Sequence, residues 1–206
     1  ENMSNKENKG SIFEKPLLST KVKSANVKLP EMLFGYFIGP FGALLASGIF
    51  TSFLNRYWTD ILFANYKVDG KLTGSINLFL TLLPLLSAIL IVAGNLVAGQ
   101  LIERTKTKAG KARPWILLSS VLLGAACVVM FIVPMGNGTS TPVLTMVLTA
   151  IAYNLYYSVA YPLYNTANST LVPVSTRNGN QRGLLASFSN FASVAVMGAG
   201  GMVFPM

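Results

Sequence analysis

The charged residues of this chain are confined to short segments, and the long segments between them carry no charge. No Asp, Glu, Lys or Arg occurs in residues 32–55, 72–102, 114–176 or 183–206. A helix crosses the hydrocarbon core of a bilayer with about 20 mostly apolar residues, so each of these segments is long enough to span a membrane. Only 11% of all residues are charged, whereas soluble domains carry about a quarter. The pattern predicts an all-α membrane protein with several spans.

The residue types that are missing exclude most enzyme chemistry. The chain has no histidine and a single cysteine, Cys127, which rules out imidazole catalysis, imidazole metal ligation and an internal disulfide. The sequence contains no paired carboxylates, metal-ligand cluster or nucleophile–base arrangement. The net charge of +9 fits basic cytoplasmic loops of a membrane protein better than a nucleic-acid partner. We expect no enzyme activity and no cofactor beyond a coupling ion, H⁺ or Na⁺.

Five membrane spans are predicted, at about residues 33–57, 73–102, 114–135, 142–171 and 183–206. Residues 1–31 are polar and rich in lysine, so we expect a flexible basic tail before the transmembrane bundle of residues 32–206. Pro162 lies inside the fourth span and is expected to kink that helix without ending it. The chain stops at the end of an apolar segment, and we therefore expect it to be part of a longer transporter.

Basic residues fall mainly on one side of these spans. Six lysines precede the first span, five basic residues follow the second and two follow the fourth, whereas the opposite side holds only Arg56, Lys67 and Lys71. Cytoplasmic loops carry the excess of Lys and Arg. We therefore expect a multi-pass protein of the cell membrane (plasma or inner membrane) with a cytoplasmic N-terminus.

The loop after the second span carries the most specific motif. Gly99 is followed by the pair Glu103-Arg104, then by basic residues, and the loop closes with Gly110-Lys-Ala-Arg113-Pro-Trp115. This loop resembles the signature of the major facilitator superfamily, and its closing sequence resembles that of the glycoside–pentoside–hexuronide:cation symporter family. The resemblance covers about residues 33–206, and it implies five of the twelve spans of a sugar transporter that works by alternating access.

Charges in this loop are expected to form a conformational latch. Glu103, Arg104 and Arg113 would make contacts in one state that break in the other, and Gly99 would let helices approach closely. The alternative is a merely basic loop that fixes the topology.

The acidic residues of the family pattern are absent from this chain. Positions where the family has sugar-binding or cation-binding acids fall on Leu44, Ile91, Asn95 and Ala160, and an arginine position of the fifth span falls on Ser189 or Asn190. A carboxylate inside the membrane is the usual means of coupling to H⁺ or Na⁺. Three alternatives stay open: the rest of the transporter supplies the coupling acid, the protein is an uncoupled facilitator, or coupling works differently. Asn95 is a weak cation-site candidate.

Tyrosines recur along the fourth span at intervals of three and four residues, from Tyr153 to Tyr164. Such spacing forms one broad helix face, and aromatic rings beside amide and hydroxyl groups suit a sugar. The resemblance implies substrate contacts for Tyr156 and Tyr164. The further substrate-binding candidates are Asn190, Ser47 and Thr51. The alternative for the tyrosines is an aromatic belt at the membrane interface.

The favoured function is the transport of a small sugar or glycoside. The expected partners are that substrate, the lipid bilayer, and either the C-terminal bundle of the same transporter or a second copy. Two alternatives stay open, namely a non-transporting half-size membrane module or subunit, and a transporter of another amphipathic cargo.

Overall fold

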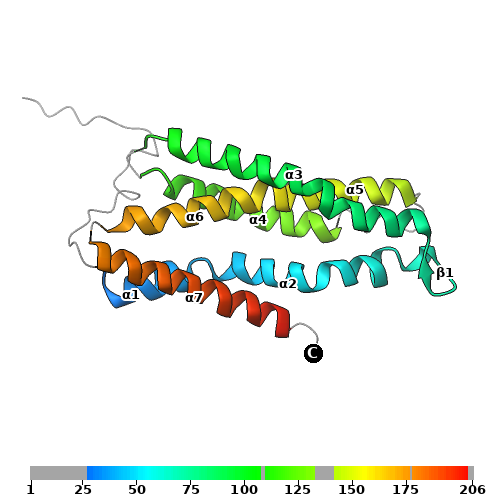
Figure 1. Ribbon diagram of the computed structural model, residues 1–206, viewed down its shortest axis with the longest axis horizontal. Coiled ribbons are helices and arrows are strands. Elements are labelled where there is room, and N and C mark those ends of the chain that lie inside the picture. Colours follow the sequence, from blue (N-terminus) through cyan, green and yellow to red (C-terminus); the bar gives the residue numbers. More distant parts are fainter. Residues whose placement is uncertain (1–26, 108–109, 133–141, 177, 204–206) are drawn as a thin grey trace, which may run out of the picture.

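The predicted all-α membrane fold is confirmed. A computed structural model describes residues 27–107, 110–132, 142–176 and 178–203, so most of the predicted basic tail lies outside the described residues. Within these ranges, five helical segments are long and apolar enough to cross a membrane. We number them spans 1 to 5: Leu29–Leu62, Gly74–Arg104, Arg113–Ile132, Pro142–Ser175 and Gly179–Met202 (Figure 1). Span 1 begins earlier and ends later than the predicted residues 33–57.

The bundle has two ends of different character (Figure 1). At the basic end, helices α3 (Gly74–Arg104) and α6 (Tyr161–Ser175) end, while α1 (Leu29–Met32), α4 (Arg113–Ile132) and α7 (Gly179–Val203) begin. At the hairpin end, strands β1 (Lys67–Val68) and β2 (Lys71–Leu72) pair antiparallel. Asp69 and Gly70 between them have positive φ angles of 49° and 75°, which a two-residue hairpin turn requires. Sequence analysis did not predict this hairpin, although Asp-Gly is its usual signal.

Span 1 is an α-helix interrupted by π-helical turns. It contains α1, the π-helical segment η3 (Leu33–Ile38), α2 (Phe41–Tyr57) and a second π-helical segment, η4 (Trp58–Leu62). A short 3-10 turn, η5 (Ala64–Tyr66), leads from it to the hairpin. The Gly39 N–H donates to the Phe34 carbonyl at 3.0 Å, five residues back, just before Pro40. A proline has no N–H to donate, so the π turn falls where the α-helical pattern must be interrupted.

Span 4 passes through Pro162 in the same way. It runs through α5 (Pro142–Asn154), the π-helical segment η6 (Leu155–Ala160) and α6. The Tyr161 N–H donates to the Tyr156 carbonyl, and Pro162 cannot donate to Ser158. Gly94 of α3 lies against the Ser158 carbonyl so closely that a Cβ at residue 94 would collide with it. Spans 2 and 4 therefore cross at a glycine.

Two groups of helices make up the bundle (Figure 1). Helices α3 and α4 pack on span 4, whereas α2 makes its most extensive contact with α7. Glycines permit the second contact: a Cβ on Gly48 would collide with the Met197 backbone, and one on Gly200 would lie 2.9 Å from the Leu45 carbonyl oxygen. Small residues let membrane helices approach in this way.

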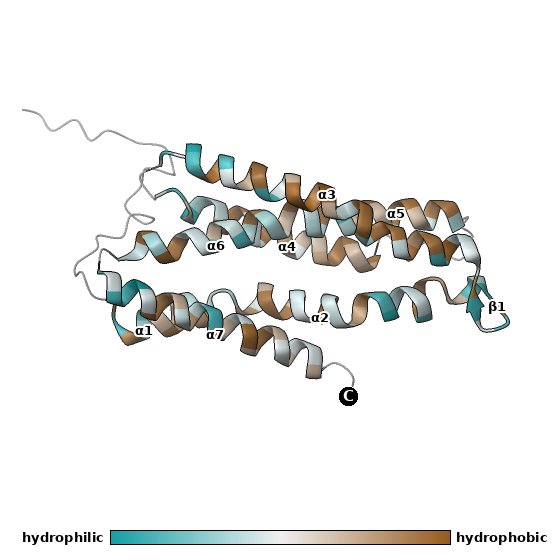
Figure 2. Cartoon of the chain, viewed as in Figure 1, coloured by the Kyte–Doolittle hydropathy of each residue, from teal (hydrophilic) through white to brown (hydrophobic). Residues whose placement is uncertain are grey.

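Large apolar side chains cover much of the outer surface. Ile89 of α3, Val121 of α4 and Val194 of α7 are 71%, 73% and 76% exposed. The most hydrophobic stretches of the chain lie along α3, α4 and α5 (Figure 2). Hydrophilic residues gather at the hairpin. This distribution suits helices whose outer faces meet lipid.

Candidate functional site

An aromatic seam joins spans 1 and 4. Phe50 meets Tyr156 edge to face with ring centroids 4.6 Å apart, and Trp58 meets Tyr153 at 5.6 Å. Tyr153 in turn lies 4.5 Å from Tyr157, one helical turn further along the span. Aromatic pairs at such distances stabilise by about 0.5–1.5 kcal/mol beyond the burial of their area. The seam fixes how the tyrosines of span 4 are presented.

The π-helical segment η6 changes which tyrosines share a face. Tyr156 and Tyr161 are five residues apart, yet their rings stack with centroids 6.0 Å apart and an angle of 22° between the planes. In a regular α-helix a spacing of five residues turns a side chain by about 140° beyond a full turn, which would separate the rings. The extra residue of the π turn restores the alignment.

Tyr157 lies next to the hydroxyl-bearing residues of span 1, Ser47 and Thr51. It is half-buried, and its side chain lies beside that of Thr51. The Thr51 hydroxyl donates to the Ser47 carbonyl at 2.8 Å. We call Ser47, Thr51, Tyr157 and Tyr161 the polar seam.

The polar seam carries groups that recognise neutral hydroxylated molecules. Thr51 is exposed, and Tyr157 and Tyr161 are partly exposed. The neighbouring Asn154 donates to the Ala150 carbonyl at 2.9 Å and accepts a bond from the Ser158 hydroxyl at 2.9 Å. Hydroxyls next to aromatic faces are suited to bind a sugar, whose C–H faces stack on rings. The seam contains no carboxylate and no histidine, so binding of a ligand there would involve no acid–base chemistry.

The predicted substrate residues do not all lie in this seam. Tyr156 is fully buried and Tyr164 is 6% exposed, so neither presents its ring at a free surface in this conformation. Ser47 is also buried, and its carbonyl oxygen accepts the bond from Thr51, whereas Thr51 lies at the surface. In this conformation Tyr157 and Tyr161 are partly exposed, whereas Tyr156 and Tyr164, the tyrosines predicted to contact the substrate, are buried.

Asn190 lies far from the polar seam along the bundle. It is exposed on α7, and the next residue, Phe191, stacks on Phe37 of span 1 with centroids 6.4 Å apart. Phe37 precedes Thr51 by 14 residues, which is roughly 21 Å of helix. The structure does not bring Asn190 together with Thr51.

Two candidates of span 2 have different surroundings from those expected. The Asn95 side chain donates to the Ile91 carbonyl at 2.8 Å within its own helix, which is a local structural bond. The expected close approach at Gly99 is wrong, because no atom lies within 4 Å of a Cβ built there. Gly94, one and a half turns earlier, makes the helix contact, because it faces the Pro162 turn of span 4.

The latch candidates lie at the basic end. Glu103, Arg104 and Arg113 are exposed, and among the described residues neither Glu103 nor Arg104 makes an ion pair. One ordered contact of this loop is made by the Trp115 Nε1–H, which donates to the Thr105 hydroxyl at 2.7 Å. The Trp115 of the motif therefore holds the end of α3 against the start of α4.

A further polar contact at the basic end was not predicted. The Tyr36 hydroxyl of span 1 bonds to the Ser175 hydroxyl at the end of span 4. Ser175 donates its own proton to the Leu171 carbonyl at 2.6 Å, so Tyr36 is the donor. Residues 139 positions apart leave no local signal, and only the packing of spans 1 and 4 brings them together.

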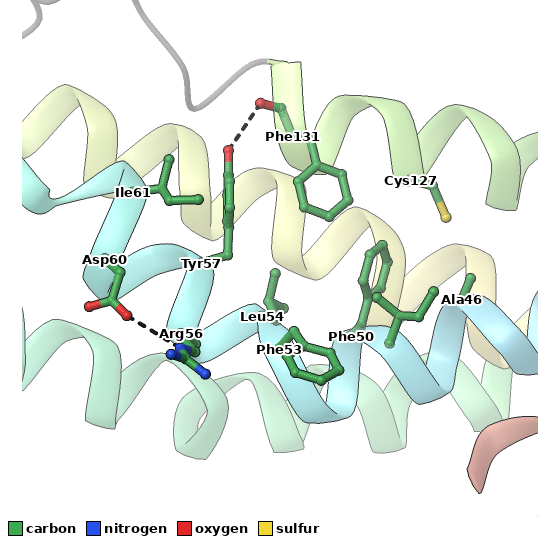
Figure 3. A pocket seen from close by; sticks show the side chains of 11 residues that line it. Ala46, Phe50, Phe53, Leu54, Arg56, Tyr57, Asp60, Ile61, Cys127 and Phe131 are labelled. Atoms are coloured by element: carbon green, nitrogen blue, oxygen red, sulfur yellow. Dashed lines mark hydrogen bonds and ion pairs between the residues drawn. The ribbon is translucent and has the colours of Figure 1, made fainter. Parts of the chain in front are cut away.

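A groove opens on another side of α2 (Figure 3). Its volume is about 730 Å³. Tyr57 and Phe131 form its hairpin end, with ring centroids 5.0 Å apart, and Arg56 and Asp60 lie at its mouth, 3.6 Å apart. The lining comes from α2, η4 and α4: Ala46, Ile49, Phe50, Phe53, Leu54, Arg56, Tyr57, Asp60, Ile61, Cys127 and Phe131. In the part of the chain that the structure describes, no cluster of His, Cys, Asp and Glu could hold a metal ion.

Comparisons with known proteins agree with the motif. Residues 35–206 match the family model of the MFS/sugar transport proteins. The chain is 24% identical over 159 residues to a lactose permease of Lactobacillus helveticus, covering 76% of this chain and 24% of that protein. It is 26% identical over 178 residues to a lactose permease of Leuconostoc lactis, covering 84% and 26%. The chain thus spans about a quarter of the length of these curated relatives. No solved structure matches it.

Proposed function

This chain belongs to the MFS/sugar transport protein family, and from that premise we propose that it forms the N-terminal bundle of a cell-membrane transporter for a small sugar or glycoside. Transport would proceed by alternating access, with this bundle rocking against the C-terminal bundle of the same transporter or of a second copy. Both relatives are lactose permeases, so lactose is the first substrate to test. The observation that supports this proposal most directly is that Tyr157 of span 4 and Thr51 of span 1 lie side by side, both at least partly exposed.

The polar seam is proposed to contact the sugar. The Tyr157 and Tyr161 rings would stack on its C–H faces, while the Thr51 and Tyr157 hydroxyls would exchange hydrogen bonds with its hydroxyls. The Thr51 hydroxyl is already held by its bond to the Ser47 carbonyl, which lowers the entropic cost of ordering it around a ligand.

Uptake of radiolabelled lactose and other glycosides into proteoliposomes tests this assignment in the full-length transporter. Tyr157→Phe removes only the hydroxyl and should weaken substrate affinity by about 1 kcal/mol, and Tyr157→Ala by about 1–3 kcal/mol. Tyr66→Phe is the matched control, because Tyr66 lies in the turn η5 beyond the end of span 1. Unchanged affinity in both Tyr157 variants would remove the substrate from this seam.

Coupling to a cation is proposed to depend on the rest of the transporter. The place of a cation-site acid is occupied here by Asn95, which has no charge to gain or lose and is bonded within its own helix. An ion-coupled mechanism normally uses a carboxylate inside the membrane. We therefore assign H⁺ or Na⁺ binding to residues outside this chain.

The basic end is proposed to face the cytoplasm and to carry the latch. Basic residues described at this end are Lys28, Arg104, Lys106, Lys111, Arg113 and Arg182, against Arg56, Lys67 and Lys71 at the hairpin end. Such an excess favours the cytoplasmic side. The exposed Glu103 and Arg104 would pair with the partner bundle in one conformation and separate in the other.

A further inference from the structure

One exposed face of span 4 is polar although it lies within a membrane span. Asn165 and Ser169 of α6 are exposed, and Tyr161 and Asn168 are half-buried. Intervals of three and four residues place Tyr161, Asn165 and Asn168 on one face of the helix. An unpaired amide is costly in hydrocarbon, so this face of α6 is suited to border water or a polar ligand and not lipid.

The side-chain amides of Asn165 and Asn168 are available to a partner. Two other asparagines of the spans, Asn95 and Asn154, each donate to the carbonyl four residues earlier in their own helix, at 2.8 and 2.9 Å. Among the described residues, by contrast, no hydrogen bond uses the side chain of Asn165 or Asn168. Each of these two amides therefore keeps its two N–H donors and its carbonyl acceptor for a group outside the described chain.

The two amides continue the polar seam toward the basic end. Asn165 follows Tyr161 by about one helical turn and Asn168 follows it by about two. Eight residues separate Tyr157 from Asn165, which is roughly 12 Å of helix. Asn165 precedes the end of span 4 at Ser175 by ten residues, which is roughly 15 Å of helix, about half the hydrocarbon thickness. Substrate sites of transporters lie at this depth, near the midplane of the bilayer.

We propose that Asn165 and Asn168 form an inner subsite that binds the hydroxyls of a second sugar ring, while the polar seam holds the first ring. This subsite rests on the proposed function, because it extends the same seam. One pyranose ring is too short to reach from Tyr157 to Asn165, whereas two linked rings cover that separation. Amides suit ring hydroxyls because they donate and accept hydrogen bonds at once, and residues 161–175 carry no charge, as suits a neutral ligand. The substrate class is therefore a disaccharide or another two-ring glycoside.

Sugar binding to the full-length transporter tests the subsite. Isothermal titration compares lactose with methyl β-galactoside and methyl β-glucoside, which each carry one of its two rings. Asn165→Ala and Asn168→Ala should each weaken lactose binding about 3- to 10-fold, the scale of a lost hydrogen bond. They should weaken the binding of at most one of the methyl glycosides, and Tyr157→Ala should weaken the binding of the other. Asn77→Ala is the matched control, because Asn77 is an exposed amide at the start of α3, at the hairpin end.

Two titration results would overturn the inner subsite. Unchanged lactose affinity in both the Asn165 and the Asn168 variant would mean that these amides do not contact the sugar. An equal loss of affinity for lactose and for both methyl glycosides would mean that the amides and the polar seam contact the same ring.

Cysteine labelling gives a second test that does not require a change of affinity. In a Cys127→Ala background, a water-soluble methanethiosulfonate should modify both Asn165→Cys and Thr51→Cys, and lactose should slow both reactions. Lactose that protects Thr51→Cys alone would overturn the inner subsite and leave the proposed function standing, whereas lactose that protects neither would overturn both. A cysteine at residue 165 that does not react would mean that protein or lipid covers this face, which also overturns the subsite.

Discussion

The rings of Phe50 and Tyr156 meet edge to face, with their centroids 4.6 Å apart, at the centre of the bundle. This contact joins span 1 to span 4, and it leaves the Tyr156 hydroxyl buried with no hydrogen-bond partner. Tyr156 thus acts in this conformation as an aromatic core residue, whereas the neighbouring Tyr157 is only half-buried.

Tyr156→Phe should therefore leave the protein as stable or more stable. A buried polar group without a partner costs about 1–3 kcal/mol, so removing the hydroxyl should raise the midpoint of thermal unfolding of the purified transporter. Tyr156→Ala should instead destabilise it by about 3–5 kcal/mol, because it leaves a cavity in the core. Sugar uptake by Tyr156→Phe should match the wild type, and a clear loss of affinity would restore Tyr156 as a substrate contact in another conformational state.

Gly94→Ala should destabilise the bundle by about 1–3 kcal/mol, the usual cost of overpacking. The added methyl group would collide with the Ser158 carbonyl, which belongs to the π turn before Pro162. Gly99→Ala is the control from the same helix, since a Cβ there meets nothing within 4 Å. Equal stability of the two variants in thermal unfolding would mean that spans 2 and 4 do not cross at Gly94.

Arg104→Ala should lower transport while the protein still inserts and folds. Removal of a charge contact made in only one state shifts the balance between states by about 1–3 kcal/mol, the usual range of coupling energies. Lys106→Ala removes the same charge two residues further along the loop and should have a smaller effect. A latch at Arg104 is excluded if both variants transport sugar at the wild-type rate over a range of substrate concentrations.

Cysteine labelling should find the two ends of the bundle on opposite sides of the membrane. In a Cys127→Ala background, a membrane-impermeant maleimide should label Lys106→Cys only from the cytoplasm and Val68→Cys only from outside. Both positions are exposed, one in the loop after α3 and the other in the hairpin. Labelling with the reverse sidedness would contradict the orientation drawn from the basic residues.

Transport of a neutral sugar should depend little on pH between 6 and 8 as far as this bundle is concerned. The chain has no histidine, the side chain whose ordinary pKa falls in that range. Uptake measured at several pH values, before and after replacement of the carboxylates in the rest of the transporter, checks this. A pH dependence that survives those replacements would place a titrating group in this chain.

The sequence alone determined the membrane class, the five spans and the family, because these depend on local patterns. An apolar run that is long enough to cross a bilayer can be recognised without knowing what packs against it. The same holds for the motif of a glycine followed by an acid and an arginine. The Asp69-Gly70 turn was equally readable, although the hairpin was not predicted.

Only the tertiary structure decided which side chains form the candidate site. A π turn adds one residue to a helix and rotates all later side chains by about 100°, so intervals of three and four along span 4 could not separate Tyr156 from Tyr157. Whether Gly94 or Gly99 meets another helix depends on where the Pro162 turn comes to lie. The groove beside α2 and the Tyr36–Ser175 bond likewise exist only because distant spans pack together, and packing between distant segments has no local signal in the sequence.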